Sequence, residues 1–219
     1  IGFIGWGDLT TTTSRLRALL PNHHLLVDID DGFGDATVAS HVARTLERCG
    51  ASGVVLEDQA RPRRCGHLNG KNLLPLQDYL VKLEAVLHHR SSLIVLARTD
   101  ASDPGEILNR VRAFEQAGCD AVLADGIKDL AFIAELRQAV SCPVFCNVIG
   151  GGKVPPCSRA ELARQGVQGL IYSTPCLFAA QEAIERALDG LTDESADLRR
   201  RRCPAAVICS TATPPWRPT

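Results

Sequence analysis

The 219-residue chain contains no methionine, few aromatic residues and no excess of charge of either sign. Its 24 lysines and arginines nearly balance 25 aspartates and glutamates, whereas nucleic-acid and anionic-membrane binders usually carry a clear basic excess. No apolar run approaches the roughly 20 residues that a membrane-spanning helix needs, and the first residues do not resemble a signal peptide. These absences predict a protein that binds neither nucleic acid nor membrane.

Disulfide-framework and zinc-finger signatures are also missing. The chain has nine cysteines, but no two are spaced as a Cys-x-x-Cys pair, and the chain is long for a disulfide scaffold. Several cysteines lie in apolar segments, as Cys146 does, which is typical of reduced and buried thiols. We therefore expect a cytoplasmic protein with free cysteines.

Short apolar runs alternate with helical patterns along most of the chain. The runs are continuous rather than alternating, as in parallel strands that are covered on both faces. The predicted strands are Gly2–Gly5, Leu25–Asp28, Gly53–Glu57, Leu93–Arg98, Ala121–Asp125, Val144–Asn147 and Gly169–Tyr172. The predicted helices between them are Ala36–Cys49, Leu76–His89, Glu106–Ala117, Ala131–Val140, Arg159–Gln165 and Phe178–Leu188. The alternation predicts an α/β fold.

A helix–glycine–strand pattern recurs at Leu46–Glu57, Phe114–Asp125 and Leu162–Ser173. Glycine adopts the left-handed conformation that ends a helix, and each strand starts two or three residues later. These repeats favour a (β/α)8 TIM-type barrel over a doubly wound sheet. A closed barrel needs eight strands, so we expect one that lacks its first strand and part of an early crossover, where only Ser14–Leu20 reads as helix.

The predicted domain boundary lies near residue 192. Residues 1–192 are expected to form the catalytic barrel, and residues 193–219 an irregular tail in which four consecutive arginines, 199–202, are solvated. The lack of methionine and the apolar start at Ile1 lead us to expect either a piece of a longer product or a truncated paralogue.

Polar residues stand at the ends of five consecutive predicted strands. They are Asp28, Asp30, Glu57, Asp58, Arg98, Asp100, Asp125 and Asn147. Reactive groups of a TIM-type barrel lie at this edge, and unpaired carboxylates there would repel one another unless a cation binds. Oxygen donors without nearby histidine or cysteine favour Mg²⁺ or Mn²⁺ over zinc, and an arginine beside the metal suits a carboxylate substrate. The alternative is that these acids are ordinary loop residues.

The segment 59–72 contains five basic side chains, two glycines and a proline, which predicts a mobile loop after a strand. Cys65 lies among Arg63, Arg64 and His67, and nearby positive charge makes a thiol a better proton donor or nucleophile. Two alternatives stay open: His67 as a plain loop histidine, and both arginines as solvated side chains.

These segments resemble those of the isocitrate lyase and PEP mutase superfamily, in particular its methylisocitrate lyase-like branch. Val27–Gly34 resembles the DADxGFG metal segment, and Pro62–Lys71 is similar to the loop that carries Cys-Gly-His. Further matches, in the family's order, are Leu56–Gln59, Ala97–Ala101, Gly118–Gly126, Asn147–Lys153 and Ile171–Tyr172. Asp125 stands where the family usually has glutamate.

The resemblance implies a Mg²⁺-dependent lyase, with Mn²⁺ as an alternative metal, that cleaves a C–C bond of a 2-hydroxy di- or tricarboxylate. The products would be an α-keto acid and a carboxylic acid, formed through an enolate. It implies Asp28, Asp30 and Glu57 as metal ligands and Cys65, His67 and Arg98 as catalytic residues. The implied substrate-binding residues are Gly5, Trp6, Gly66, Arg98, Asp125 and Asn147.

A homo-oligomer, a tetramer in the family, is implied as well. Two other functions remain open: phosphonomutase or phosphonopyruvate-type chemistry at a P–C bond on the same platform, and a non-catalytic truncated paralogue.

Overall fold

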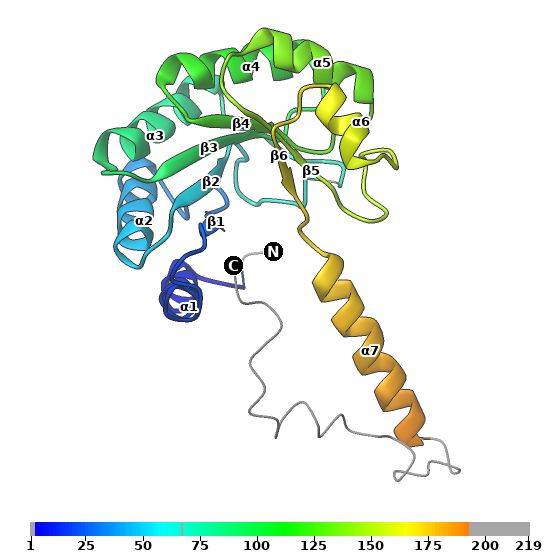
Figure 1. The fold of residues 1–219 in the computed structure, drawn as a ribbon. Helices are drawn as coiled ribbons and strands as arrows, with labels where there is room; N and C mark the ends of the chain where they lie inside the picture. Colours follow the sequence, from blue (N-terminus) through cyan, green and yellow to red (C-terminus); the bar gives the residue numbers. More distant parts are fainter. Residues whose placement is uncertain (1–2, 67, 193–219) are drawn as a thin grey trace. The chain divides into compact units, whose positions relative to one another are not determined.

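A six-stranded parallel sheet forms the centre of the fold (Figure 1). The computed structural model describes residues 3–66 and 68–192. The strands are β1 (Leu26–Asp28), β2 (Gly53–Glu57), β3 (Ile94–Thr99), β4 (Ala121–Ala124), β5 (Val144–Asn147) and β6 (Gly169–Ile171). Each strand pairs with the next along the chain, in the order β1-β2-β3-β4-β5-β6. This order is that of a (β/α) barrel wall, here curved into a half-barrel, and the predicted α/β class is confirmed.

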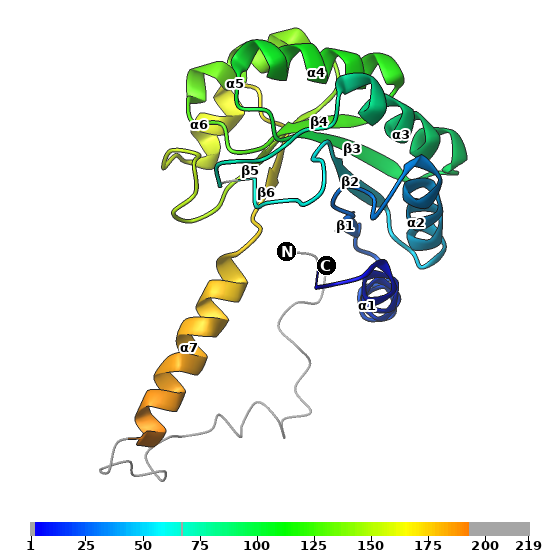
Figure 2. The ribbon, with the colours of Figure 1, turned by 180° about the vertical axis from the view of Figure 1, so that it is seen from behind.

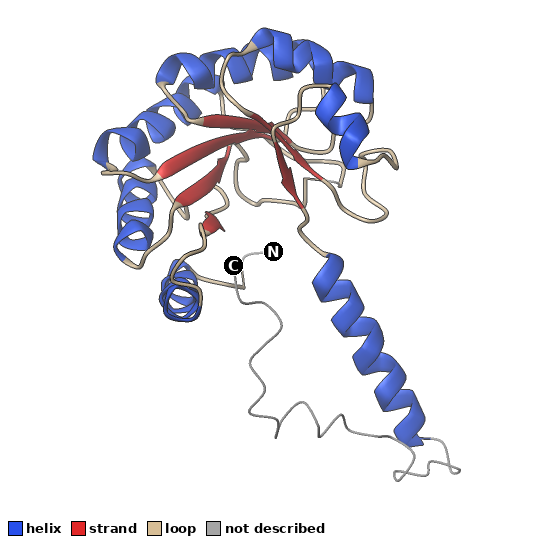
Figure 3. Ribbon diagram, viewed as in Figure 1, coloured by secondary structure: helices blue, strands red, loops and turns tan. Residues whose placement is uncertain are grey.

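The helices that connect successive strands cover the outer face of the sheet (Figures 2 and 3). They are α2 (Ala36–Arg48), α3 (Leu76–His89), α4 (Pro104–Ala117), α5 (Leu130–Ala139) and α6 (Arg159–Arg164). Two further helices, α1 (Trp6–Leu19) and α7 (Pro175–Thr192), precede β1 and follow β6 in the chain. Outward-facing strand residues such as Val54, Val95 and Val122 are completely buried against them. Each fully buried valine contributes roughly 1.5–3 kcal/mol, so this layer is the main apolar core.

Local signals set the ends of these helices. The side chains of Asp35, Asp103 and Asp129 accept hydrogen bonds from main-chain amides in the first turns of α2, α4 and α5. Gly118 adopts a left-handed conformation with φ 95° and ends α4, as the helix–glycine–strand pattern predicts.

The predicted first strand, Gly2–Gly5, is wrong over its described residues, because residues 3–5 are in no strand and a helix begins at Trp6. The Gly5 amide donates to Asp8 Oδ2 at 2.9 Å, which caps α1. Helix was expected only at Ser14–Leu20, whereas α1 begins at Trp6. Threonine is a poor helix former, so the Thr-rich start of α1 carries little helical signal. Arg17 holds α1 against the rest of the unit. Its Nη2 and Nε donate to the Gly50 carbonyl at 2.7 and 3.0 Å.

The described chain divides at Ser173 into a unit of residues 3–173 and a unit of residues 174–192. The second unit is α7, on which Leu177, Ile184 and Leu188 are exposed. The predicted tail, 193–219, lies outside the described residues. None of the helices described is long and apolar enough to cross a bilayer. Within the described part, all seven cysteines are free: 49, 65, 119, 142, 146, 157 and 176.

Candidate active site

The ends of the strands bring the predicted polar residues to one edge of the sheet. Asp28, Glu57 and Asn147 end β1, β2 and β5, and Asp125 follows β4 directly. Glu57 is paired in register with Arg98 of β3. Because the strands are parallel neighbours, these residues share the carboxyl edge, as the barrel prediction requires.

Arg98 lies at the centre of the cluster. Its Nη2 is 2.8 Å from Asp125 Oδ2, 3.1 Å from Asp100 Oδ1 and 3.5 Å from Glu57 Oε2, and its Nη1 is 3.6 Å from Asp28 Oδ2. The side chain is 10% exposed. Burial alone would lower the pKa of Arg98, but the surrounding carboxylates outweigh burial and raise it, so the guanidinium stays charged. Its Nε is buried and has no hydrogen-bond partner among the described residues.

A chain of hydrogen bonds extends from this cluster to the end of the sheet. Asn147 Nδ2 donates to Asp125 Oδ1 at 3.1 Å, and Ser173 Oγ donates to Asn147 Oδ1 at 2.7 Å. A cavity of about 340 Å³ opens on the inner face of the sheet and is lined by Asp28, Arg98, Asn147 and Ser173 with apolar neighbours. The cluster therefore combines one fixed cation with hydrogen-bonding groups beside a space for a small ligand.

Asp30 and Glu57 converge on a second guanidinium, that of Arg63. Arg63 Nη1 is 2.6 Å from Glu57 Oε1, and its Nη2 contacts Asp30 Oδ2. Burial is the largest influence on Glu57 and raises its pKa to about 8, although Arg98 and Arg63 oppose the change. Burial also raises the pKa of Asp30. Carboxylate oxygens of Asp30 and Glu57 thus lie on either side of one cation, and oxygen donors of this kind are those that Mg²⁺ prefers.

Asp28 is less well placed for direct ligation. Its side chain is 51% exposed, and its Oδ1 accepts a hydrogen bond from the Asp30 amide at 2.9 Å. In the described part of the chain, no three His, Cys, Asp or Glu side chains are grouped to hold a metal ion. The predicted trio of ligands is thus represented by a convergent pair, Asp30 and Glu57, with Asp28 alongside.

The loop after β2 lies directly over the Arg98 cluster. Gly66 is buried, and a Cβ built on it would stand only 1.9 Å from Asp125 Oδ2 and 2.5 Å from Asp100 Oδ1. Lys71 Nζ donates to the Gly66 carbonyl at 2.6 Å, and Lys153 Nζ donates to the Leu68 carbonyl at 3.2 Å. Only glycine fits at this position, because any side chain would overlap the two carboxylates.

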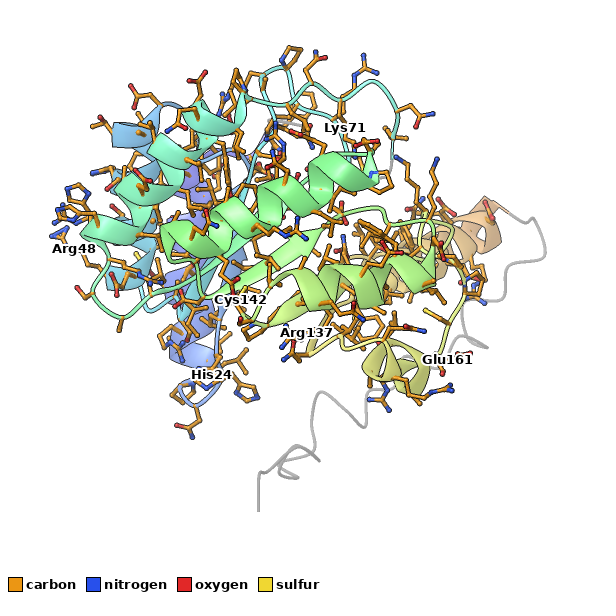
Figure 4. The ribbon with its side chains drawn as sticks, turned by 90° about the horizontal axis from the view of Figure 1, so that it is seen from above. His24, Arg48, Lys71, Arg137, Cys142 and Glu161 are labelled. Atoms are coloured by element: carbon orange, nitrogen blue, oxygen red, sulfur yellow. The ribbon has the colours of Figure 1, made fainter. Side chains whose placement is uncertain are left out.

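In Figure 4, Lys71 and His24, which precedes β1, lie on opposite sides of the fold. This placement agrees with a loop held at the carboxyl edge. Cys65 is exposed beside the seated Gly66, and His67 lies outside the described residues.

The two residues predicted from the first segment are separated. Gly5 lines a cavity of about 510 Å³ together with Asp30, Arg61 and Arg63. Trp6 is not part of that lining and packs edge-on against His41, with 5.5 Å between the ring centroids. Their roles in substrate binding stay predictions.

A family model described as phosphoenolpyruvate phosphomutase matches residues 4–192. The chain belongs to the PEP mutase/isocitrate lyase superfamily. The 2-methylisocitrate lyase of Bacillus subtilis (strain 168) is 35% identical over 165 residues, which cover 74% of this chain and 55% of that protein. The chain thus spans little more than half of this superfamily relative.

Two solved superfamily structures agree with the fold. A crystal structure of 2,3-dimethylmalate lyase has a TM-score of 0.88 at 26% identity and covers 95% of this chain and 72% of that one. Oxaloacetate acetylhydrolase in complex with 3,3-difluorooxalacetate has a TM-score of 0.84 at 28% identity and covers 88% and 68%. The predicted family and barrel-type fold are therefore confirmed.

Within this superfamily fold, the prediction missed several residues that hold the loop and the cluster. Ser173 lies two residues beyond β6, at the same edge as the predicted site residues. Its position just after a strand could have identified it as a site residue from the sequence. Lys71 and Lys153 were not predicted to bind the loop, because the Gly66 and Leu68 carbonyls that accept from them are main-chain groups that no motif marks. Lys71 Nζ also lies 3.4 Å from Asp100 Oδ1.

Proposed function

We propose that the chain forms the catalytic part of a metal-dependent lyase that cleaves a C–C bond of a small 2-hydroxy di- or tricarboxylate. The products would be an α-keto acid and a second carboxylic acid. Relatives named 2-methylisocitrate lyase and 2,3-dimethylmalate lyase support the reaction class. The observation that carries the proposal is the contact of Gly66, beside Cys65, with the buried Arg98 and Asp125.

Asp30 and Glu57 would hold Mg²⁺ directly, and Asp28 would hold it through water. Mg²⁺ keeps several waters and commonly uses only one or two protein carboxylates, which suits this convergent pair. The donor atoms of Asp28, Asp30 and Glu57 are all oxygens, so Mg²⁺ or Mn²⁺ is preferred to zinc. When bound, the ion would act as a Lewis acid for the carboxylate and α-oxygen of the substrate.

Arg98 is suited to stabilise negative charge that develops as the bond breaks. Asp100, Asp125 and Glu57 all lie within 3.5 Å of its Nη2 and hold the guanidinium in place, so it needs no reorganisation when charge appears. Its Nε has no hydrogen-bond partner in the described chain, which leaves one donor for a ligand. Asn147 and Asp125 would orient the substrate within the small cavity beside them.

Cys65 would act as the general acid. As the C–C bond breaks, the 2-hydroxyl group loses its proton to water and its oxygen becomes the keto oxygen. The electron pair of the broken bond remains on the departing carbon, and the thiol gives that carbon a proton. Gly66 would bring the loop backbone against the site and exclude water from the reactive carbanion. A role for His67 beside the second carboxylate stays a prediction.

The test is a Mg²⁺-dependent screen of the full chain with 2-methylisocitrate, 2,3-dimethylmalate and oxaloacetate, with the keto acid or oxalate detected. Cys65→Ser should lose turnover by about a hundredfold or more, whereas Cys176→Ser, at another exposed cysteine, should not. Equal turnover of wild type and Cys65→Ser would remove the proposed acid. Turnover of a phosphonate instead would favour P–C chemistry, and no turnover with any substrate would favour the non-catalytic alternative.

A further inference from the structure

The position of Arg63 between two acids has a consequence for metal binding. Arg63 comes from the loop, its side chain is 10% exposed, and it contacts both Asp30 and Glu57. Its Nε also approaches Asp31 Oδ1 at 3.7 Å. One guanidinium thus occupies the space between the two carboxylates that would share a divalent ion.

Both oxygens of Glu57 lie beside arginines. Oε1 is 2.6 Å from Arg63 Nη1, and Oε2 is 3.5 Å from Arg98 Nη2. An incoming divalent ion at Glu57 would therefore stand beside two guanidinium groups of like charge, and this repulsion favours displacement of one of them. Arg98 is fixed in β3 and also pairs with Asp100 and Asp125, so it is the harder group to move.

Arg63 can leave without unfolding the start of the loop. The neighbouring Arg61 binds Asp31 through two hydrogen bonds, from Nε at 2.6 Å and from Nη2 at 3.0 Å. Further on, Gln59 accepts from the Arg64 amide and donates to the Arg64 carbonyl, at 2.9 and 2.8 Å. These contacts flank Arg63 on both sides, and none of them uses its side chain.

We propose that Arg63 is an internal counterion that competes with the divalent ion for Asp30 and Glu57, so that metal loading expels Arg63 from the site. This inference rests on the proposed metal-dependent function. A guanidinium does not lose its proton in proteins, so the exchange requires movement of the side chain. Because coupling between two equilibria is reciprocal, metal loading would also loosen the backbone around residue 63, while the contacts of Arg61 and Gln59 keep the loop in place on either side.

The experiment is calorimetric titration of the metal-free full chain with Mg²⁺ at pH 9, where proton competition for Glu57 is small. Arg63→Gln should bind Mg²⁺ about tenfold to a hundredfold more tightly than wild type, because a charge-assisted contact no longer has to be broken. Arg63→Lys keeps the charge but cannot bridge both acids, and it should lie between the two.

Arg64→Gln is the matched control, since it removes the same charge from the adjacent residue. The Arg64 side chain is exposed and forms no ion pair in the described part of the chain. The Arg64→Gln protein should therefore bind Mg²⁺ with the affinity of wild type. Hydrogen exchange of the peptide spanning 61–66 gives a second readout. Mg²⁺ should speed exchange in wild type, and Arg63→Gln should exchange fast without metal.

Equal affinities for wild type and Arg63→Gln, or weaker binding by Arg63→Gln in a folded protein, would overturn the inference. Absence of Mg²⁺ binding by wild type and by all three variants would overturn the metal-dependent function together with it. Circular dichroism of each variant confirms that it is folded before titration.

Discussion

Two buried networks of charged side chains start from adjacent residues, Glu57 and Asp58, and lie on opposite faces of the sheet. On the inner face, the guanidinium of Arg98 faces four carboxylates and keeps a buried Nε without a partner among the described residues. On the outer face, Asp58 binds Arg110 of α4 at 3.0 Å. The other donors of Arg110 reach Glu106 and a main-chain carbonyl.

The difference between these networks lies in their balance. The outer network matches its donors to acceptors, and Asp58 additionally accepts from the Asp100 amide at 3.0 Å. The inner network also includes Lys71, whose Nζ lies 3.4 Å from Asp100 Oδ1, but the buried Nε of Arg98 has no partner among the described residues, so one donor remains for a ligand. Burial raises the pKa of both Glu57 and Asp58, so a raised pKa by itself does not separate a functional carboxylate from a structural one.

Neutralising Glu57 is expected to have the largest effect on activity. Glu57→Gln should lower metal-dependent turnover on the order of a thousandfold, because it removes one of two convergent metal ligands. The free energy of unfolding should stay equal or rise, because the variant removes an acid that is costly to bury. Steady-state kinetics and urea unfolding measure the two effects. Retained turnover with lost stability would make the inner network structural.

The same isosteric change at the next residue should do the opposite. Asp58→Asn leaves the Arg110 guanidinium, 6% exposed, without its buried counter-charge, and should cost about 2–3 kcal/mol of stability. Turnover per folded molecule should change less than tenfold, because Asp58 faces α4. Urea midpoints at constant slope, with kinetics on the folded protein, test this. A large loss of turnover at unchanged stability would place Asp58 in the site.

Much of the inner network could be predicted from the sequence, and the outer network could not. Strand ends and the barrel rule are enough to bring Asp28, Glu57, Arg98, Asp125 and Asn147 to one edge. The same rule also placed Asp58 among these site residues. Its contact with Arg110 of α4, which the sequence does not indicate, shows that it faces outward.

The sequence also could not show that the loop basic residues bind acids. Arg63 was left open as a solvated side chain, whereas it is buried against Asp30 and Glu57. Such a contact depends on the path of a loop, which local patterns do not determine.

Adding a side chain at Gly66, where the loop contacts the site, should have the third largest effect. In Gly66→Ala, the added methyl group would overlap Asp125 Oδ2 and Asp100 Oδ1, so the loop backbone cannot reach its present position. Turnover should fall by about a hundredfold, since small displacements of catalytic groups cost this much, while stability should change by less than about 1 kcal/mol. Gly70→Ala controls for loop strain. Gly70 lies in the same loop at φ 75°, and a Cβ built on it would be 3.5 Å from its nearest neighbour, Arg64 Nη1. Equal losses in both variants would attribute the effect to strain rather than to contact with the site.

The smallest expected effect is the pH dependence of stability in the metal-free protein, and it tests whether the inner network is unbalanced. The pKa of Glu57 is raised from its usual 4.5 to about 8, so between these pH values the folded chain binds more protons than the unfolded chain. Stability should therefore fall as pH rises through this window, with a slope from Glu57 of at most about 1.4 kcal/mol per pH unit. Glu57→Gln should lose this slope. Asp58, whose pKa is also raised, pairs with Arg110 rather than with Arg63 or Arg98, so its contribution is present in both proteins and cancels in the difference. Equal slopes for wild type and Glu57→Gln in urea unfolding from pH 5 to 8 would show that Arg98 and Arg63 already neutralise Glu57, and the inner network would then be as balanced as the outer one.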